Sequence, residues 1–271
     1  MSEHGRLDAE LVRRGLARSR GQARELIDAG LVSVAGRVAR KPAVPVAEGD
    51  ELVVRDAGPR WVSRAAYKLV GALEHFGPMG LDVRGRRCLD VGASTGGFTQ
   101  VLLHHGAGHV VALDVGRDQL VRELGADPRV TERSQTTVRG LRAEDIGGPV
   151  DVLVADLSFI SLTLVLETFR GLLRDSGDAG VLVQPQFEVG RARLGKGGIV
   201  RAQGDRAWAV TEVARAALEA GLHPRALAPS PIDGGEGNAE YLLWLTPRAA
   251  DSLGWEALVR TADQVTLKGA S

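Results

Sequence analysis

Three polar residues, far apart in the sequence, have side chains that could orient a hydroxyl group and take up its proton. Lys68 lies four residues after Arg64 on a predicted helix, away from the apolar stripe of that helix. Asp156 directly follows an apolar run typical of a buried strand, and Glu240 precedes another such run. A lysine can act as a base when burial or a positive neighbour lowers its pKa. Each residue also has an ordinary interpretation, as a surface lysine, a helix cap and a strand-edge acid.

A glycine-rich segment, residues 89–98, joins a predicted buried strand to a predicted helix. From Asp90 to Gly97 its order is D-x-G-x-x-x-G-G, which lacks the middle glycine of the dinucleotide motif G-x-G-x-x-G. Asp114 ends the next predicted strand, about twenty residues on, where an acid can bind both hydroxyls of a ribose. The segment resembles motif I of S-adenosylmethionine-dependent methyltransferases, whose glycines pack under the amino-acid end of the cofactor.

This resemblance implies S-adenosylmethionine as the cofactor, and it leaves NAD as the less favoured alternative. The residues expected to hold the cofactor are Asp90, Gly92, Ala93, Ser94, Thr95, Gly96, Gly97, Phe98, Asp114 and Asp156. The histidines at 104, 105 and 109 and the cysteine at 88 fit no standard zinc spacing, so we expect no metal.

The first fifty residues concentrate basic side chains, which could neutralise several phosphates or simply form a solvated face balanced by acids. The order of residues in this stretch, from Arg6-Leu7-Asp8 through Ser19-Arg20-Gly21-Gln22-Ala23 to Gly49-Asp50, resembles the S4 RNA-binding domain. That resemblance implies RNA contacts from the second helix and its loop. The candidate RNA-binding residues are Arg6, Arg14, Arg18, Arg20, Arg24 and, outside this stretch, Arg64.

The elements that would carry these N-terminal residues are short. Asp8 could cap a helix that ends at Gly15, and Ser19 with Gln22 forms a capping box that opens a second helix, which Gly30 ends. Residues 31–38 alternate about Gly36 as a hairpin does, and residues 51–54 form a closing strand. We expect an S4 domain over residues 1–55 and a linker over residues 56–62.

The rest of the chain, residues 63–271, alternates strands and helices, which indicates a mostly parallel sheet covered on both faces. Ser63 is expected to cap a helix with an apolar stripe at Leu69, Leu73 and Phe76. The expected strands are 88–91, 109–113, 150–155, 181–183, one around Leu227, and 241–245. The expected helices are 98–105, 119–124, one ending at residue 172, and 205–220.

Composition excludes several classes of protein. The chain has 271 residues, 34 basic and 34 acidic, so any phosphate binding must come from local clusters rather than from net charge. No apolar run is long enough to cross a bilayer and the N-terminus has no apolar core of a signal peptide, so no membrane partner is expected. Cys88 is the only cysteine, which suits a cytoplasmic setting.

Five blocks together carry a more specific resemblance. They are Ser63-Arg64 with Lys68-Leu69, the glycine-rich segment, Ala155-Asp156-Leu157-Ser158-Phe159-Ile160-Ser161, Pro185-Gln186-Phe187-Glu188-Val189-Gly190, and Gly237-Asn238-Ala239-Glu240-Tyr241. With the S4-like segment in front, the chain resembles the hemolysin A or TlyA family. The resemblance implies a Rossmann-like α/β class I methyltransferase of the FtsJ type, with a mixed seven-stranded sheet, preceded by a small α+β S4 domain. It also implies 2′-O-methylation of cytidine in ribosomal RNA, with ribosomal subunits as partners.

FtsJ-type enzymes use a Lys-Asp-Lys-Glu set, and the resemblance places its first, second and fourth members at Lys68, Asp156 and Glu240. The third position, a lysine usually assigned as the base, is Gln184 in this chain. Glutamine can hydrogen-bond a hydroxyl but cannot accept its proton. Losing that help typically costs about 10²–10⁴-fold in rate. Lys68 is the favoured replacement, with Lys196 in a glycine-containing loop, residues 191–198, as the second choice.

Three hypotheses follow from the sequence. The favoured one is an rRNA 2′-O-methyltransferase. The second is a catalytically weak or inactive rRNA-binding or ribosome-assembly protein, which Gln184 favours. The third and least favoured is a small-molecule methyltransferase with an incidental S4 domain.

Overall fold

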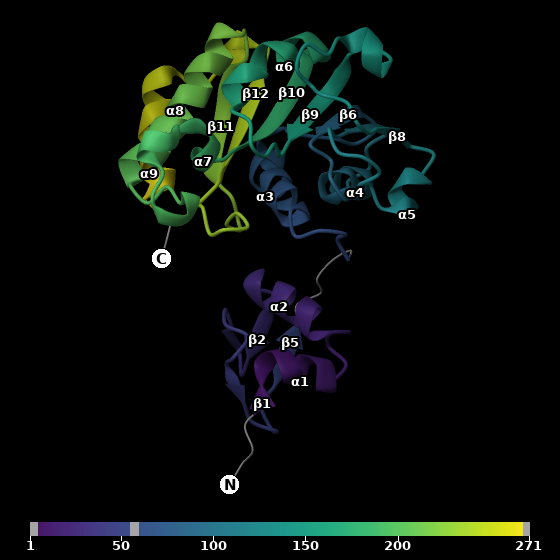
Figure 1. Cartoon of the computed structure of the whole chain (residues 1–271), viewed down its shortest axis with the longest axis vertical. Coiled ribbons are helices and arrows are strands. Elements are labelled where there is room, and N and C mark those ends of the chain that lie inside the picture. Colours follow the sequence, from purple (N-terminus) through teal and green to yellow (C-terminus); the bar gives the residue numbers. More distant parts are fainter. Residues whose placement is uncertain (1–4, 55–59, 268–271) are drawn as a thin grey trace. The chain divides into compact units, whose positions relative to one another are not determined.

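The chain divides into two compact units, Met1–Arg60 and Trp61–Ser271 (Figure 1). The computed structural model describes residues 5–54 and 60–267, so residues 56–59 of the expected linker lie outside the described part. Each unit has its own apolar core. The finer boundaries at 1–55, 56–62 and 63–271 stay a prediction.

The N-terminal unit is a small α+β domain. Its elements are β1 (Gly5–Arg6), α1 (Leu7–Arg13), α2 (Arg20–Asp28), β2 (Val32–Val34), β3 (Arg37–Val38), β4 (Pro45–Val46) and β5 (Leu52–Val54). The strands form a three-stranded sheet in the order β3-β2-β5 and a separate β1-β4 pair. Leu7 and Leu11 of α1 pack with Ala23 and Ile27 of α2 in the core, as the apolar spacing predicted for α2.

The two expected helix caps in this unit have different outcomes. The Ser19 hydroxyl accepts a hydrogen bond from the Gln22 amide (3.2 Å), so the cap of α2 is confirmed. The Gln22 side-chain oxygen accepts a hydrogen bond from the amide of Arg18 (2.7 Å) and not from that of Ser19. The cap at Asp8 was wrong: α1 begins one residue earlier, and the Asp8 side chain is fully buried and paired with arginines. A carboxylate with cationic partners nearby does not need the helix amides.

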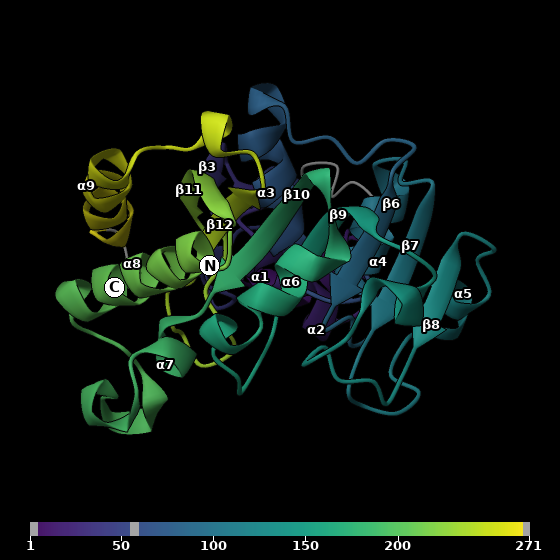
Figure 2. The same ribbon diagram turned by 90° about the horizontal axis from the view of Figure 1, so that it is seen from above.

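The C-terminal unit is built on a mixed seven-stranded sheet, which confirms the predicted fold class. The strand order is β11-β12-β10-β9-β6-β7-β8, visible across Figure 2. The strands are β6 (Arg87–Val91), β7 (His109–Leu113), β8 (Val130–Arg133), β9 (Val150–Ala155), β10 (Leu173–Val183), β11 (His223–Pro229) and β12 (Tyr241–Thr246). The strands from β10 to β8 are parallel, and β12 runs antiparallel to both β10 and β11.

Helices cover both faces of this sheet and separate two cores. The helices are α3 (Ala66–Phe76), α4 (Gly97–His104), α5 (Arg122–Gly125), α6 (Leu166–Leu172), α7 (Pro185–Glu188), α8 (Gln203–Glu219) and α9 (Trp255–Thr266). Short 3-10 turns lie at Gly77–Met79, Ala143–Ile146, Leu162–Leu164, Arg191–Arg193, Lys196–Gly198 and Ala249–Asp251. Strand β9 sends Leu153 and Ala155 to the α6 and α8 side and Val152 and Val154 to the α3 and α4 side. Both faces are buried from Val152 to Ala155, which explains the apolar run of these four residues.

Several element boundaries differ from the expected ones. Helix α3 begins at Ala66 without a side-chain cap, so the Ser63 cap was wrong. Helix α5 is shorter than the expected helix over 119–124, and β10 begins at Leu173, eight residues before the expected strand. Strand β8 and helix α9 were not predicted. Among the described residues, no helix is both long enough and apolar enough to cross a membrane.

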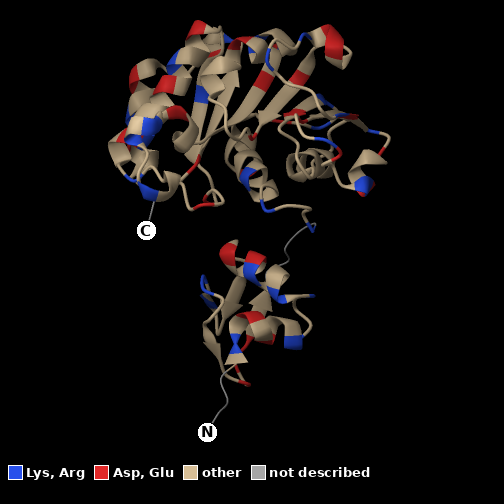
Figure 3. Ribbon diagram, in the orientation of Figure 1, with Lys and Arg blue, Asp and Glu red and all other residues tan. Residues whose placement is uncertain are grey.

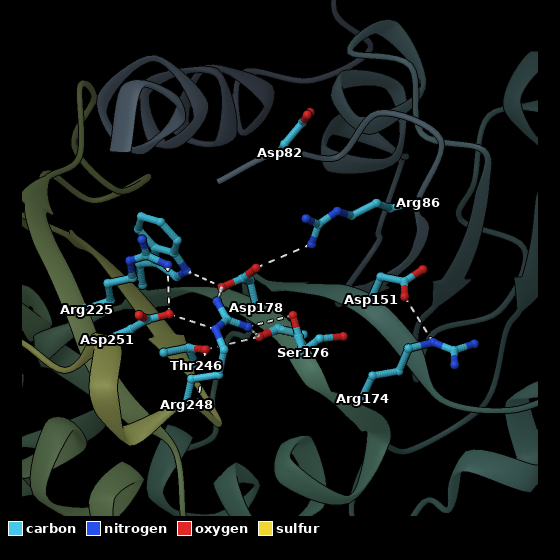
Figure 4. Close-up of polar contacts among 12 residues, drawn as sticks. Asp82, Arg86, Asp151, Arg174, Ser176, Asp178, Arg225, Thr246, Arg248 and Asp251 are labelled. Atoms are coloured by element: carbon cyan, nitrogen blue, oxygen red, sulfur yellow. Dashed lines mark hydrogen bonds and ion pairs between the residues drawn. The ribbon is translucent and has the colours of Figure 1, made fainter. Parts of the chain in front are cut away.

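A network of polar side chains joins strands at the edge where the parallel strands begin (Figure 4). Its centre is Asp178 of β10, which is 2% exposed. The Asp178 carboxylate accepts hydrogen bonds from the Trp244 indole (2.9 Å) and Arg248 (2.9 Å) and pairs with Arg86 (3.4 Å). Arg225 lies over the Trp244 ring, 4.3 Å from its centroid. We call these five residues the Asp178 network.

Candidate active site

The main pocket, about 490 Å³ in volume, opens at the opposite edge of the sheet, where the parallel strands end. Residues that follow β6, β9 and β10 line it, together with residues from the start of α3 and the segment before β12. The carboxyl edge of a parallel sheet is the usual place for a ligand in α/β folds. The pocket lies entirely within the C-terminal unit.

The structure brings Lys68, Asp156 and Glu240 together in this pocket. The Lys68 ammonium lies 3.1 Å from Asp156 Oδ2 and 2.8 Å from Glu240 Oε2. Lys68 lies off the apolar stripe of α3 and is nevertheless only 8% exposed. Glu240 is 3% exposed. The three residues come from α3, the end of β9 and the start of β12, so folding alone makes them neighbours. The ordinary interpretations as a surface lysine and a strand-edge acid do not describe these buried positions.

Gln184 joins the same cluster from the end of β10. Its side-chain nitrogen donates to Asp156 Oδ1 (2.9 Å) and to the Leu157 carbonyl (2.8 Å). Both partners are acceptors, so the orientation of the amide is fixed with its nitrogen toward them. Its oxygen is left as an acceptor, which Gln186 approaches at 3.4 Å. Where a lysine would offer only donors, Gln184 therefore keeps Asp156 in place and offers an acceptor.

The cluster contains two carboxylates and one cation, and all three side chains are largely buried. Burial raises the pKa of Glu240, and the positive charge of Lys68 opposes this only in part. Arg64 is the next nearest cation, and its guanidinium donates to the Asp233 carbonyl at 2.6 Å. An excess of negative charge in a buried pocket favours a ligand that carries positive charge, such as a sulfonium.

The glycine-rich turn forms one wall of the pocket. At Gly92, φ is +85° and a Cβ atom would lie 2.5 Å from the Asp156 carbonyl oxygen. A Cβ on Gly96 would collide with Leu124, and one on Gly97 would collide with the Ser63 hydroxyl. These glycines are thus required because other parts of the chain approach them closely. Ser63, which does not cap α3, packs against the turn instead.

Seven of the ten expected cofactor residues line the main pocket, and three do not. Those that line the main pocket are Gly92, Ala93, Ser94, Thr95, Gly97, Phe98 and Asp156. Gly96 packs against α5, as described. Asp114 lines a small adjoining recess that shares Ala93 and Ser94 with the main pocket. The Asp114 carboxylate accepts bonds from the Ser94 amide (2.8 Å) and the Gly116 amide (2.7 Å), so it is held in one orientation.

Asp90 lies beneath the turn and does not line either recess. It is fully buried, and one carboxylate oxygen accepts a 2.6 Å hydrogen bond from the Thr99 hydroxyl. The other oxygen has no hydrogen-bond partner among the described residues. Burial raises the pKa of Asp90 to about 7. This position suits support of the turn better than the expected direct contact with a cofactor.

Sequence reasoning missed Phe159 at the rim of the pocket. Its side chain is 92% exposed, and its backbone has φ of +65°, a region that bulky residues rarely adopt. Its ring lies 5.3 Å from that of Phe187, centroid to centroid. An exposed aromatic ring held by an unfavourable backbone conformation indicates a functional position. No glycine or asparagine marks the positive φ, so the sequence carried no signal for it.

The loop of residues 191–198, whose Lys196 was the second choice for the base, is held by hydrogen bonds. Asn238 donates to the Gly198 carbonyl (3.1 Å) and accepts from the Val200 amide (2.9 Å). Leu194 and Gly198 line the pocket, whereas Lys196 does not. Within residues 5–54 and 60–267, no three His, Cys, Asp or Glu side chains are grouped so that they could hold a metal.

The N-terminal unit carries both basic and acidic residues (Figure 3), and its candidate RNA-binding arginines differ in their contacts. Arg14 is tied to Glu10 (3.1 Å) and to the Asp50 carbonyl (2.6 Å), so it acts mainly within the fold. Arg18 is exposed. The remaining three, Arg6, Arg20 and Arg24, all pair with Asp8. Arg64 belongs to the other unit and lines its main pocket.

Comparison with known proteins assigns both units to families. The family model for FtsJ-like methyltransferases matches residues 61–246, and the S4 domain model matches residues 5–52. The 16S/23S rRNA (cytidine-2′-O)-methyltransferase TlyA of Mycobacterium tuberculosis is 53% identical over 97% of this chain and 98% of its own length. Hemolysin A of Brachyspira hyodysenteriae is 37% identical over 88% of this chain and 98% of its own length.

A solved structure extends the similarity to the fold of the whole chain. A protein of Streptococcus thermophilus, provisionally named a hemolysin, is 36% identical, has a TM-score of 0.70, and covers 99% of this chain and 98% of its own. The match includes the S4-like unit as well as the methyltransferase unit. The chain therefore belongs to the TlyA, or hemolysin A, family of FtsJ-like methyltransferases.

Proposed function

We propose that this protein transfers a methyl group from S-adenosylmethionine to the ribose 2′-hydroxyl of cytidine in ribosomal RNA. The observation that carries the proposal is the convergence of Lys68, Asp156 and Glu240 in one pocket beside the glycine-rich turn. The name of the Mycobacterium tuberculosis relative, which shares half of its residues with this chain, supports the same reaction. An rRNA substrate would place the reaction in the cytoplasm.

S-adenosylmethionine would supply an electrophilic methyl group, so the task of the protein is to position the hydroxyl and remove its proton. The lining of the pocket fits such a cofactor: the backbone of the glycine-rich turn lines it, and Asp114 offers a fixed carboxylate in the adjoining recess. The excess negative charge of the cluster suits a sulfonium. Gly92, Ala93, Ser94 and Asp114 are the residues that we expect to hold it.

We assign proton removal to Glu240 rather than to Lys68. Lys68 donates a hydrogen bond to Asp156 and forms an ion pair with Glu240, and so holds both carboxylates at fixed positions. Burial raises the pKa of Glu240 toward the working pH, which makes it a stronger base than an exposed glutamate. As the hydroxyl oxygen bonds to the methyl carbon and the bond from that carbon to the cofactor sulfur breaks, the hydroxyl proton would pass to the Glu240 carboxylate. The sequence-based choice of Lys68 as the base remains the alternative.

Gln184 has a task in this arrangement even though it cannot accept a proton. Its amide nitrogen donates to Asp156 and so fixes the carboxylate that we expect to orient the incoming hydroxyl. The other three members of the cluster keep their contacts around it. A catalytically inactive rRNA-binding protein is therefore the less favoured hypothesis.

The remaining parts fit an RNA substrate. Phe159 presents an exposed ring at the rim of the pocket, where a base of the target nucleotide could stack once it leaves its helix. The S4-like unit carries the exposed arginines expected to bind the rRNA backbone. A small-molecule substrate would use neither feature.

The test is methyl transfer from labelled S-adenosylmethionine to ribosomal subunits that lack the modification. We expect the wild-type protein to label a cytidine 2′-oxygen, and Lys68→Ala to abolish most of the label. Glu74→Gln, an exposed acid on the same helix α3, serves as the control and keeps full activity. If only Gln184→Lys transferred label, the natural protein would be the inactive rRNA-binding protein instead.

A further inference from the structure

The carboxylate of Asp8 is shared by three arginines in the N-terminal unit. Arg6 approaches it with two nitrogens, Nε at 3.0 Å from Oδ1 and Nη2 at 3.3 Å from Oδ2. Arg20 Nη2 lies 3.4 Å from Oδ1, and Arg24 Nε lies 3.5 Å from Oδ2. Asp8 itself is 0% exposed. A single buried anion thus serves three cations from β1 and α2.

The three guanidinium groups are not buried with their partner. The side chains of Arg6, Arg20 and Arg24 are 51%, 57% and 58% exposed. Each guanidinium has five N–H donors, and Asp8 takes one or two of them, so donors remain for another anion. One negative charge among three positive charges leaves a local excess of two positive charges. Without the carboxylate, like charges so close together would repel each other.

Other arginines in the unit lack this arrangement. Arg13 and Arg14 share Glu10, and Arg14 is further held by backbone carbonyls. The hydrogen bonds of Arg6 are the main reason that the pKa of Asp8 falls to about 2. The charge of the centre therefore persists through the whole neutral range. The cluster is a fixed feature of the fold under physiological conditions.

We propose that Asp8 is a positioning residue for RNA binding, because it gathers Arg6, Arg20 and Arg24 into one preassembled phosphate-binding cluster. This inference rests on the proposed RNA substrate. It adds Asp8 to the candidate RNA-binding residues, all of which were arginines. Guanidinium groups in a fixed arrangement bind phosphodiester oxygens in pairs and lose less side-chain entropy on binding. The partner that this chemistry fits is a folded RNA backbone.

Two opposite changes in RNA affinity are conceivable for Asp8→Asn. Asp8→Asn removes a negative charge, so charge counting alone predicts tighter binding of the full-length protein to unmodified ribosomal subunits. Loss of positioning predicts the reverse. We expect the Kd to rise about ten-fold, and the slope of log K against log salt to become shallower by about one to two units as phosphate contacts are lost. A purely structural role would not change that slope at a temperature where both proteins are folded.

Glu25→Gln is the matched control, because it removes the same charge from an exposed position on α2. We expect Glu25→Gln either to leave the Kd unchanged or to lower it. If Asp8→Asn also leaves the Kd unchanged or lowers it, the inference is overturned while the proposed function stands. If the wild-type protein does not bind the subunits at all, both are overturned.

A second measurement covers the case in which Asp8→Asn does not fold. Arg20→Ala, Arg24→Ala and the double variant keep the buried acid and test whether the arginines act as a unit. A preassembled cluster predicts that the double variant loses less affinity than the sum of the two single losses, because either truncation already disrupts the set. Additive losses would contradict the proposal.

Discussion

The two edges of the central sheet use buried charge in opposite ways. At the amino edge, the Asp178 network surrounds one carboxylate with two arginines and an indole N–H. At the carboxyl edge, one ammonium, that of Lys68, lies between the carboxylates of Asp156 and Glu240. One edge has more donors than its anion requires, and the other has more anions than its cation can neutralise.

This difference separates stability from chemistry within one sheet. The arginines of the amino edge stay about one third exposed, and Asp251 pairs with Arg248 at 2.7 Å, so water and a second carboxylate balance their positive charge while Asp178 is fully bonded. The surplus negative charge of the carboxyl edge is buried, which raises the pKa of Glu240 and leaves Asp90 with an unpaired oxygen. Such a cost is typical of a site that is kept for a reaction.

The largest effect should come from Glu240→Gln, which removes the proposed proton acceptor and keeps its shape. We expect the rate of methyl transfer to fall by about 10²–10⁴-fold. The free energy of unfolding should stay the same or rise, because the variant removes a buried negative charge that has only partial compensation. Single-turnover transfer and urea denaturation measure the two quantities.

Lys68→Ala is the comparison for this prediction. It removes the cation that both carboxylates share, so it should lower activity and the free energy of unfolding together. If Glu240→Gln kept at least half of the wild-type rate, proton removal would have to be reassigned to Lys68. The pH dependence of the rate in Gln184→Lys would then show which lysine titrates.

Asp90 should make the stability of the carboxyl edge depend on pH. Its pKa is raised by burial to about 7, from 3.8 in an exposed setting, so the folded state binds its proton more tightly than the unfolded state does. This contribution to stability is complete below about pH 4 and is lost as the pH rises through about 7. The full loss would be roughly 4 kcal/mol at most.

The measurement compares wild type with Asp90→Asn by urea denaturation between about pH 4 and pH 8. Asparagine stays neutral, so the wild type should lose stability relative to the variant as the pH rises. A constant difference between the two proteins across this range would show that Asp90 does not titrate there. The opposite edge offers a control in Asp151→Asn, where the acid is partly exposed and paired with Arg174 at 3.0 Å.

The sequence predicted best those elements that are buried on both faces. The bounds of β7 and β9 agree with the expected ranges, because the apolar runs of residues 110–113 and 152–155 end where burial ends. Strand β8 was missed because it is an edge strand with a polar sequence, Val-Thr-Glu-Arg. Helix α9 contributes Leu258 and Ala262 to the core, but their stripe is narrow and no cap marks its start.

The candidate site was predictable in its members and not in its contacts. Asp156 could be placed at a strand end from local patterns, whereas Lys68 came to the cluster only through the family resemblance. Polar residues with partners outside their own helix gave wrong interpretations, and Asp8 and Ser63 were both taken for helix caps. A local rule cannot see that Arg20 or Gly97 will be packed against them.

At the amino edge, Asp178→Asn should lower stability and spare activity. The variant loses charge-assisted bonds to Arg248 and Arg86, although both arginines can turn to water because they are partly exposed. We expect the free energy of unfolding to fall by about 2 kcal/mol, less than for a fully buried ion pair. Methyl transfer at a temperature where the variant is folded should remain within two-fold of wild type, roughly the error of such assays. A loss of activity as large as that of Glu240→Gln would contradict the inference that the amino edge serves stability and the carboxyl edge serves catalysis.

The smallest effect on stability concerns Phe159, where the carboxyl edge holds an exposed ring on an unfavourable backbone conformation. Phe159→Asn places a residue that tolerates positive φ at this position, so the free energy of unfolding should rise by about 0.5–1 kcal/mol. Transfer at low RNA concentration should fall by about five- to ten-fold, because a stacking surface worth about 1 kcal/mol is lost. Phe159→Leu is the control, since it keeps the strained backbone and removes only the ring. It should lower transfer without the gain in stability, and full activity in Phe159→Leu would show that no base stacks there.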